Sequence, residues 1–147
     1  MANGHVGSLV VDVCVAVKWF VEEVEAEKAR SLLTSGLQLI APDLFVAELG
    51  SALLKKVRQG EMTADAVLAA LASIELVVTL LPSLAVAGEA FDLASRYNRS
   101  FYDALYVALA VREGCQVVTA DEKLINGMGA PFRDRFLLLS DAQAGAV

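Results

Sequence analysis

Histidine and cysteine are scarce in this 147-residue chain, and their scarcity excludes several kinds of site. His5 is the single histidine, and Cys14 and Cys115 are the two cysteines. Three such residues cannot fill a tetrahedral Cys/His zinc site. Ser-His-Asp and Cys-His catalysis are excluded because both would depend on His5. The cysteines form no CxxC pair and are expected to be reduced thiols, so any catalysis must use carboxylates, hydroxyls, lysines or an oxygen-ligated metal ion.

Long apolar runs are also missing, although 56% of the residues are hydrophobic and the mean hydropathy is +0.56. The longest uncharged stretches, Ser31–Pro42 and Leu76–Gly88, are shorter than the roughly 20 residues of a membrane-spanning helix. No basic residue precedes the first apolar run, as it would in a secretory signal. We therefore expect a cytoplasmic protein without membrane contact, and one α/β domain over residues 1–147 with a buried parallel sheet.

Apolar β-rich runs alternate with longer helical patterns, which predicts a parallel sheet with helices on both faces. The predicted strands are Ser8–Val11, Leu37–Ala41, Leu76–Leu80, Gln116–Thr119 and Phe136–Leu139. The predicted helices are Ala16–Phe20, Glu25–Ser35, Pro42–Gln59, Ala64–Ile74, Leu84–Tyr97, Tyr102–Glu113 and Glu122–Asn126. Functional sites of open parallel sheets gather beyond the C-terminal ends of the strands.

Two aspartates follow predicted strand ends, and each has two interpretations. Asp12 stands among apolar residues, where a carboxylate is expected to be hydrogen-bonded, paired or bound to a metal ion. It can equally cap the helix that follows. Asp121 stands in VVTADEKL, where Thr119 and Glu122 match a capping box that would place Asp121 in the first helical turn.

Two further acids lie on predicted helices. Glu48 has no basic residue three or four positions away, so its helix offers it no ion pair. It either belongs to a site or is simply exposed beside the apolar stripe. Asp103 begins a helix that is apolar nearly all round and is expected to be central. Ser100 and Asp103 also match a capping box.

The four acids together predict a metal site. Converging carboxylates repel one another unless a cation lies among them. Ligation by oxygen alone suits Mg²⁺ or Mn²⁺. Such an ion can activate water and stabilise the charge that develops on a phosphodiester.

Four stretches occur in the order and spacing of PIN-domain ribonucleases, and the chain resembles in particular the VapC-like toxins of toxin–antitoxin pairs. They are VVDVCVAVKWF (Val10–Phe20), APDLFVAEL (Ala41–Leu49), SFYDALYVALA (Ser100–Ala110) and VVTADEKL (Val117–Leu124). The resemblance implies a PIN-like three-layer α/β/α fold with a parallel sheet of about five strands. It also implies a Mg²⁺- or Mn²⁺-dependent endoribonuclease that forms a homodimer and binds a cognate antitoxin.

The resemblance assigns roles to five residues. The family's acids, which hold the metal ion directly or through water, fall on Asp12, Glu48, Asp103 and Asp121. The family's hydroxyl two residues before the last acid falls on Thr119, where it would orient a carboxylate or a water molecule.

Two positions depart from the family pattern. Cys14 stands where serine or threonine is common, and a thiol is a weaker hydrogen-bond partner, so support for the metal site is expected to be softer. Lys123 stands where some relatives carry another acid, which argues against more than one ion. Lys123 either contacts an RNA phosphate or is an ordinary helix charge.

Basic residues are outnumbered, since 12 Lys and Arg against 18 Asp and Glu give a formal charge of −6. This balance opposes general nucleic-acid binding, so we expect selective, salt-sensitive binding of RNA near the acids. The remaining basic residues that we consider either line an RNA groove or are ordinary surface charges: Lys18, Arg96, Arg99 and Arg112.

Several aromatic and apolar residues also have two interpretations. Trp19 and Phe20 either stack on bases or pack in the core, and Tyr102 and Tyr106 are expected in the core or an interface. The apolar residues of Ser31–Leu33 and Val46–Leu54 either form a dimer or antitoxin surface or belong to the core.

The same residues argue against two other functions. A phosphoacceptor domain would need an aspartate at the end of the middle strand, and Leu76–Ser83 contains none. A DxD-type phosphatase would need an acid in place of Cys14. The alternative that stays open is a catalytically silent PIN-like scaffold that only binds protein.

Overall fold

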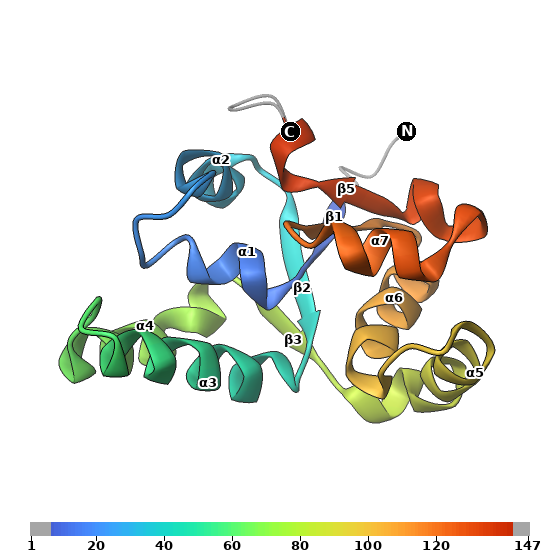
Figure 1. Ribbon diagram of the computed structural model, residues 1–147, viewed down its shortest axis with the longest axis horizontal. Helices are drawn as coiled ribbons and strands as arrows, with labels where there is room; N and C mark the ends of the chain where they lie inside the picture. Colours follow the sequence, from blue (N-terminus) through green and yellow to red (C-terminus); the bar gives the residue numbers. More distant parts are fainter. Residues whose placement is uncertain (1–6, 143–147) are drawn as a thin grey trace, which may run out of the picture.

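Five short strands form one sheet in the computed structural model, which describes residues 7–142 (Figure 1). The strands are β1 (Ser8–Val11), β2 (Gln38–Pro42), β3 (Thr79–Leu81), β4 (Gln116–Thr119) and β5 (Phe136–Leu138). Their order is β3-β2-β1-β4-β5, and every neighbouring pair is parallel. The predicted α/β/α fold with a parallel sheet of about five strands is therefore confirmed.

Helices cover both faces of this sheet (Figure 1). One face carries α1 (Val13–Val17), α2 (Ala26–Ser31), α3 (Phe45–Arg58) and α4 (Ala64–Ser73), and the other carries α5 (Ala87–Tyr97), α6 (Phe101–Glu113) and α7 (Glu122–Met128). The division follows from the right-handed crossover rule, because the chain steps from β1 out to β3 and then returns past β1 to β4. Within the described residues, none of these helices has the length and apolarity needed to cross a membrane.

Five short 3₁₀ helices fill the connections in the described part of the chain. They are η1 (Leu32–Thr34), η2 (Ile74–Leu76), η3 (Ser83–Val86), η4 (Ala130–Arg135) and η5 (Leu139–Asp141). Leu76, which we expected to begin a strand, ends η2, and β3 begins only at Thr79. The apolar run around Leu76 is too short for periodicity to separate a strand from a helical turn.

The helix expected to begin at Pro42 begins at Phe45 instead. Pro42 is the last residue of β2 and lies opposite Leu81 of β3. The next peptide continues this pairing, because the Asp43 N–H donates to the Leu81 carbonyl at 2.8 Å. Tertiary pairing with β3 therefore extends the strand over a residue whose local signal favoured a helix start.

The directions of two helices bring their first turns to one edge of the sheet. α3 follows β2, so it begins at the C-terminal edge of the strands, and Glu48 is in its first turn. α6 precedes β4 and is antiparallel to it, so its first turn, with Asp103, lies at the same edge. α6 is fixed there by an apolar body whose residues from Ala104 to Ala110 are all buried.

Candidate active site

The centre of the site is the junction of β1 and β4, where the strand order changes direction. Val11 lies opposite Val118, and the Asp12 N–H extends the ladder by donating to the Val118 carbonyl at 3.1 Å. This register places Thr119, which is fully buried, next to Asp12. The Thr119 hydroxyl donates to Oδ2 of Asp12 at 2.7 Å and accepts the Asp121 N–H at 3.0 Å.

Asp12 does not use its side chain to cap α1. It occupies the residue before the helix, but its carboxylate makes no capping hydrogen bond. Both side-chain hydrogen bonds to Asp12 fall on Oδ2, one from Thr119 and one from the Cys14 thiol at 3.2 Å. The carboxylate is therefore held by groups on two elements, α1 and β4.

Cys14 is a second support for Asp12, in spite of its weaker donor. Its sulfur also accepts the Ala120 N–H at 3.3 Å, so the side chain links α1 to the turn after β4. Burial, followed by the negative charge of Asp12, raises the pKa of the Cys14 thiol to about 12. Cys14 therefore stays protonated at neutral pH and acts as a hydrogen-bond donor, not a thiolate ligand.

Glu48 is half-buried and held from across the site by Tyr106. The phenol of Tyr106, which is 3% exposed, donates to Oε1 of Glu48 at 2.6 Å. This bond joins α3 to α6. Glu48 is thus oriented toward the site and is not simply exposed beside the apolar stripe.

Asp103 lies in the first turn of α6, next to both a cap and a cation. The Ser100 hydroxyl accepts the Asp103 N–H at 3.0 Å, which is half of the predicted capping box. Among the described residues, no hydrogen bond returns from the Ser100 N–H to the Asp103 carboxylate. That carboxylate instead accepts a long bond of 3.4 Å from Nη2 of Arg99.

The charges of three acids interact at this edge. Burial raises the pKa of the Asp12 carboxyl, the hydrogen bonds from Thr119 and Cys14 oppose the change, and the charge of Asp103 adds to it. Burial also raises the pKa of Glu48, against the Tyr106 hydrogen bond and together with the charges of Asp12 and Asp103. The sheet edge therefore brings Asp12, Glu48 and Asp103 close enough to repel one another.

Asp121 is placed differently from the other three. It is exposed and is itself the N-cap of α7, where its carboxylate accepts the Lys123 N–H at 2.9 Å. The predicted capping box starting at Thr119 is wrong, because the Thr119 hydroxyl is directed at Asp12 and the helix starts two residues later. The Asp121 side chain faces a pocket of about 430 Å³ that Glu25 and Ser140 also line.

The acids do not form a preformed metal-binding site in the described part of the chain. Across residues 7–142, no three histidine, cysteine, aspartate or glutamate side chains are grouped so that they could hold an ion. His5 lies outside the described residues. The donor set of Asp12, Glu48 and Asp103 consists only of carboxylate oxygens, and its mutual repulsion is what a hard divalent cation would relieve. The residues therefore fit Mg²⁺ or Mn²⁺ by chemistry and charge.

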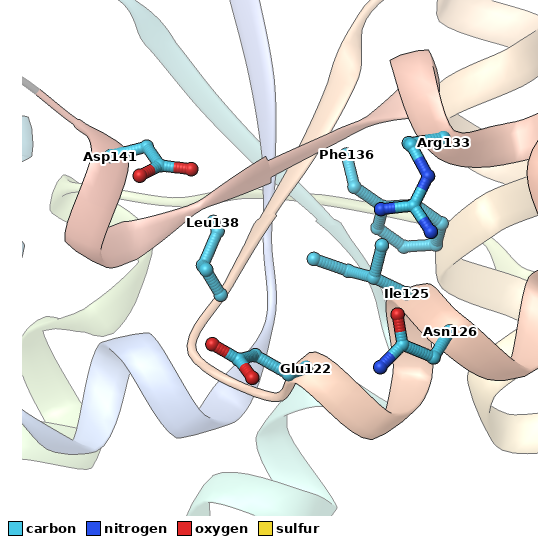
Figure 2. Close-up of a pocket in the computed structure, with 7 residues that line it drawn as sticks. All are labelled: Glu122, Ile125, Asn126, Arg133, Phe136, Leu138 and Asp141. Atoms are coloured by element: carbon cyan, nitrogen blue, oxygen red, sulfur yellow. The ribbon is translucent and has the colours of Figure 1, made fainter.

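A separate pocket of about 280 Å³ lies between α7 and β5 (Figure 2). Polar groups of Glu122, Asn126, Arg133 and Asp141 surround apolar side chains in it. None of the interacting acids lines this pocket, so it is not part of the candidate site.

The other predicted contacts have ordinary structural roles. Trp19 is buried and donates from Nε1 to the Ala29 carbonyl at 2.8 Å, so it packs in the core. Lys18 binds Glu23 and the Val24 carbonyl, and Arg112 binds the Ala85 carbonyl. On α3, Leu49 and Leu53 are core residues. Exposed apolar side chains lie at Leu33, Val46, Leu54 and Tyr102.

Two contacts of the site escaped the sequence analysis. Tyr106 was expected in the core or an interface, and its bond to Glu48 joins residues 58 positions apart, which no local pattern reveals. Arg99 was considered as a groove residue, but its spacing of four from Asp103 was a readable signal for an ion pair.

Known proteins resemble this chain over most of its length. The PIN domain family matches residues 9–127. The chain is 31% identical over 119 residues to Ribonuclease VapC3 of Pyrobaculum aerophilum, an alignment that covers 79% of this chain and 91% of that protein. It is 33% identical over 91 residues to Ribonuclease VapC1 of Mycobacterium tuberculosis, covering 62% of this chain and 68% of that protein.

The fold has a match among solved structures as well. The crystal structure of PAE2754 from Pyrobaculum aerophilum superposes with a TM-score of 0.67 and 21% sequence identity. The match covers 91% of this chain and 85% of that one. Family and fold agree, and the chain belongs to the PIN domain family.

Proposed function

We propose that this protein is a Mg²⁺- or Mn²⁺-dependent endoribonuclease and the toxin of a toxin–antitoxin pair. The observation that carries the proposal is that Asp12, which follows β1, and Glu48 and Asp103, in the first turns of α3 and α6, lie at one edge of the sheet, where the charges of Asp12 and Asp103 affect Glu48. Membership of the PIN domain family and the similarity to proteins named Ribonuclease VapC support it.

The residues that would hold the metal ion are Asp12, Glu48 and Asp103, with Asp121 as a further ligand at the same edge. When bound, the ion would supply an activated water for in-line attack on a phosphodiester. Thr119 and Cys14 fix the direction of the Asp12 carboxylate, and Tyr106 fixes Glu48. These hydrogen bonds reduce the reorganisation that the acids need before they act together.

Asp121 already has a structural role at the start of α7. Its carboxylate now caps α7, and a cap of this kind stabilises a protein by about 1 kcal/mol. The Thr119 hydroxyl, which contacts both the Asp12 carboxylate and the Asp121 backbone N–H, links the backbone of Asp121 to Asp12. We propose that Asp121 joins the site through its second oxygen or through water.

The biological partners follow from the same proposal. We propose that the protein works in the cytoplasm on RNA, forms a homodimer and is inhibited by a cognate antitoxin that covers the acidic edge. A small neighbouring reading frame that encodes a DNA-binding protein would support the toxin role.

A thermal titration tests the metal site. Added Mn²⁺ is expected to raise the Tm of the wild-type protein, since binding to the native state alone stabilises it. The double variant Asp12→Asn/Asp103→Asn should lose this rise. The control Asp65→Asn/Asp134→Asn, which neutralises two exposed acids away from the site, should keep it. An equal rise in the site variant would place the ion elsewhere.

A cleavage assay with Mn²⁺ separates the enzyme from a silent scaffold. Asp103→Asn should reduce cleavage of a structured RNA by orders of magnitude, because a metal ligand is lost. Without metal, its Tm should equal or exceed that of the wild type, since one repelling charge is gone. If Asp103 only supports the helix start, the change should cost at most about 1 kcal/mol and leave cleavage intact. Ser100→Ala, which removes the cap and keeps Asp103, is the matched control and should retain cleavage.

A further inference from the structure

Arg99 projects from a turn whose backbone is fixed on both sides. Asn98 ends α5 in the left-handed region with φ of 51°, and the Arg99 N–H donates to the Ala94 carbonyl at 3.2 Å. The following residue, Ser100, caps α6. The guanidinium of Arg99 therefore leaves a rigid turn one helical turn before Asp103.

The guanidinium of Arg99 lies against the backbone of α7 at Gly127. A Cβ on Gly127 would lie 2.4 Å from Nη1 and 2.7 Å from Cζ of Arg99. The φ of Gly127 is not in the left-handed region, so backbone conformation does not require glycine at this position. The close approach of Arg99 does require it. Gly127 therefore leaves room for the Arg99 guanidinium between α6 and α7.

Most hydrogen-bond donors of Arg99 have no partner at this position among the described residues. A guanidinium carries five N–H donors, and the described residues give Arg99 one side-chain bond, the 3.4 Å contact with Asp103. Nε is buried and, among the described residues, is the only buried side-chain nitrogen or oxygen atom without a partner. The side chain as a whole is 27% exposed, so its Nη groups can be reached from solvent.

Three of the other basic residues named in the sequence are bonded to groups away from the interacting acids. Lys18 is bonded to Glu23 and to a carbonyl, Arg112 is bonded to a carbonyl, and Arg96 pairs with Asp92 on α5. Among these residues, Arg99 alone contacts one of the interacting acids.

We propose that Arg99 is the residue that binds an RNA phosphate beside the acid cluster, and that it serves as the counter-ion of Asp103 until RNA is bound. A cluster of carboxylates repels a polyanion, and a guanidinium next to it supplies planar donors that match phosphate oxygens. This role rests on the proposed ribonuclease function, and it assigns Arg99 as the group that binds the substrate phosphate at that site.

The proposal predicts two changes of opposite direction when Arg99 is neutralised. RNA binding should weaken, because a phosphate donor is lost. Mn²⁺ binding should strengthen, because a cation that pairs with Asp103 no longer opposes the ion. If Arg99 only packed against Gly127, its replacement would lower the Tm without tightening Mn²⁺ binding. The pair of effects therefore separates the two roles.

The experiment compares Arg99→Gln, Arg99→Lys and Arg96→Gln with the wild type. Arg96→Gln is the matched control, because it removes the same charge from another Asp–Arg pair of spacing four. We measure the Kd for Mn²⁺ without RNA, the Kd for RNA in EDTA, and kcat and KM for cleavage. Arg99→Gln should raise the Kd and KM for RNA about tenfold and lower the Mn²⁺ Kd about threefold. Arg99→Lys should recover part of the RNA binding, and Arg96→Gln should change each value less than about twofold.

A second variant tests the position of the guanidinium without removing its charge. Gly127→Ala should displace the end of the Arg99 side chain, which is flexible, and raise the KM for RNA while the protein stays folded. Unchanged RNA and Mn²⁺ binding in Arg99→Gln, with cleavage intact, would overturn the role of Arg99 alone. A wild-type protein that neither binds Mn²⁺ nor cleaves RNA would overturn the ribonuclease proposal itself.

Discussion

Thr119 is, within residues 7–142, the one polar side chain that is buried in full, and its hydroxyl is completely used. It donates to Asp12 and accepts from the Asp121 backbone, so one side chain connects the acids that follow β1 and β4. A buried hydroxyl is retained only where it has partners. Thr119 therefore supports the site from inside the sheet.

We predict that Thr119→Val destabilises the protein by about 1–3 kcal/mol, because the Asp121 N–H and the Asp12 carboxylate each lose a partner. The shape of the side chain is nearly unchanged, so the loss measures the hydroxyl. Urea unfolding without divalent metal gives the value. Thr119→Ser keeps the hydroxyl and should lose less, and a valine variant as stable as the serine variant would contradict this role.

At the scale of elements, an ion-pair cluster ties the segment between α1 and α2 to α3. The Glu23 carboxylate binds Lys56 of α3 at 2.7 Å and Lys18 at 3.4 Å. These cations, Lys56 first, hold the pKa of Glu23 below its ordinary value of 4.5. A carboxyl whose pKa is lowered by folding stabilises the native state above its unfolded pKa, and this contribution disappears as the pH falls through the folded pKa.

We predict that Glu23→Gln lowers the Tm by at most a few degrees at pH 7, because the pair is partly exposed. The difference from the wild type should shrink as the pH falls through the lowered pKa of Glu23, because the wild-type carboxylate then becomes neutral as well. Thermal unfolding at pH 7 and at a series of acidic pH values measures it. Glu27→Gln is the control, since Glu27 is exposed and forms no ion pair among the described residues, and it should show no such pH-dependent gap.

At the scale of the whole molecule, the high apolar content is only partly explained by the core. Large side chains remain exposed on η3, α5 and α6, among them Leu84 at 87% and Phe91 at 68%. A further set lies on α3 and α4, with Leu54 at 46% and Leu68 at 64%. Exposed apolar side chains in such number favour association.

We predict that the protein is a dimer at micromolar concentration, because association would remove part of this apolar surface from water. Light scattering should give twice the monomer mass. Two double variants should reveal which face is used, Leu84→Lys/Phe91→Lys and Leu54→Lys/Leu68→Lys. Only the variant that alters the dimer interface should be a monomer. A wild-type monomer at high concentration would contradict the dimer.

The sequence by itself determined the fold class and singled out the acids of the candidate site. The alternation of apolar runs with helical patterns gives a parallel sheet, and β1 and β4 have the predicted bounds because buried strands read as continuous β-branched runs. Asp12, Glu48 and Asp103 were recognisable because each is an acid in apolar surroundings. That signal is local and chemical, so it survives without knowledge of the fold.

Only the tertiary structure decided which groups meet. The register of β1 against β4 brings Thr119 to Asp12, and the start of α3 and α6 at the same edge of the sheet brings Tyr106 to Glu48. Gly127 and Arg99 belong to different helical regions, and only packing shows that the glycine leaves room for the guanidinium. The local pattern predicts that Thr119 caps the helix that follows β4, but in the structure Asp121 is the cap. The Thr119 hydroxyl binds Asp12 instead, because a buried carboxylate without a partner costs more than a surface cap contributes.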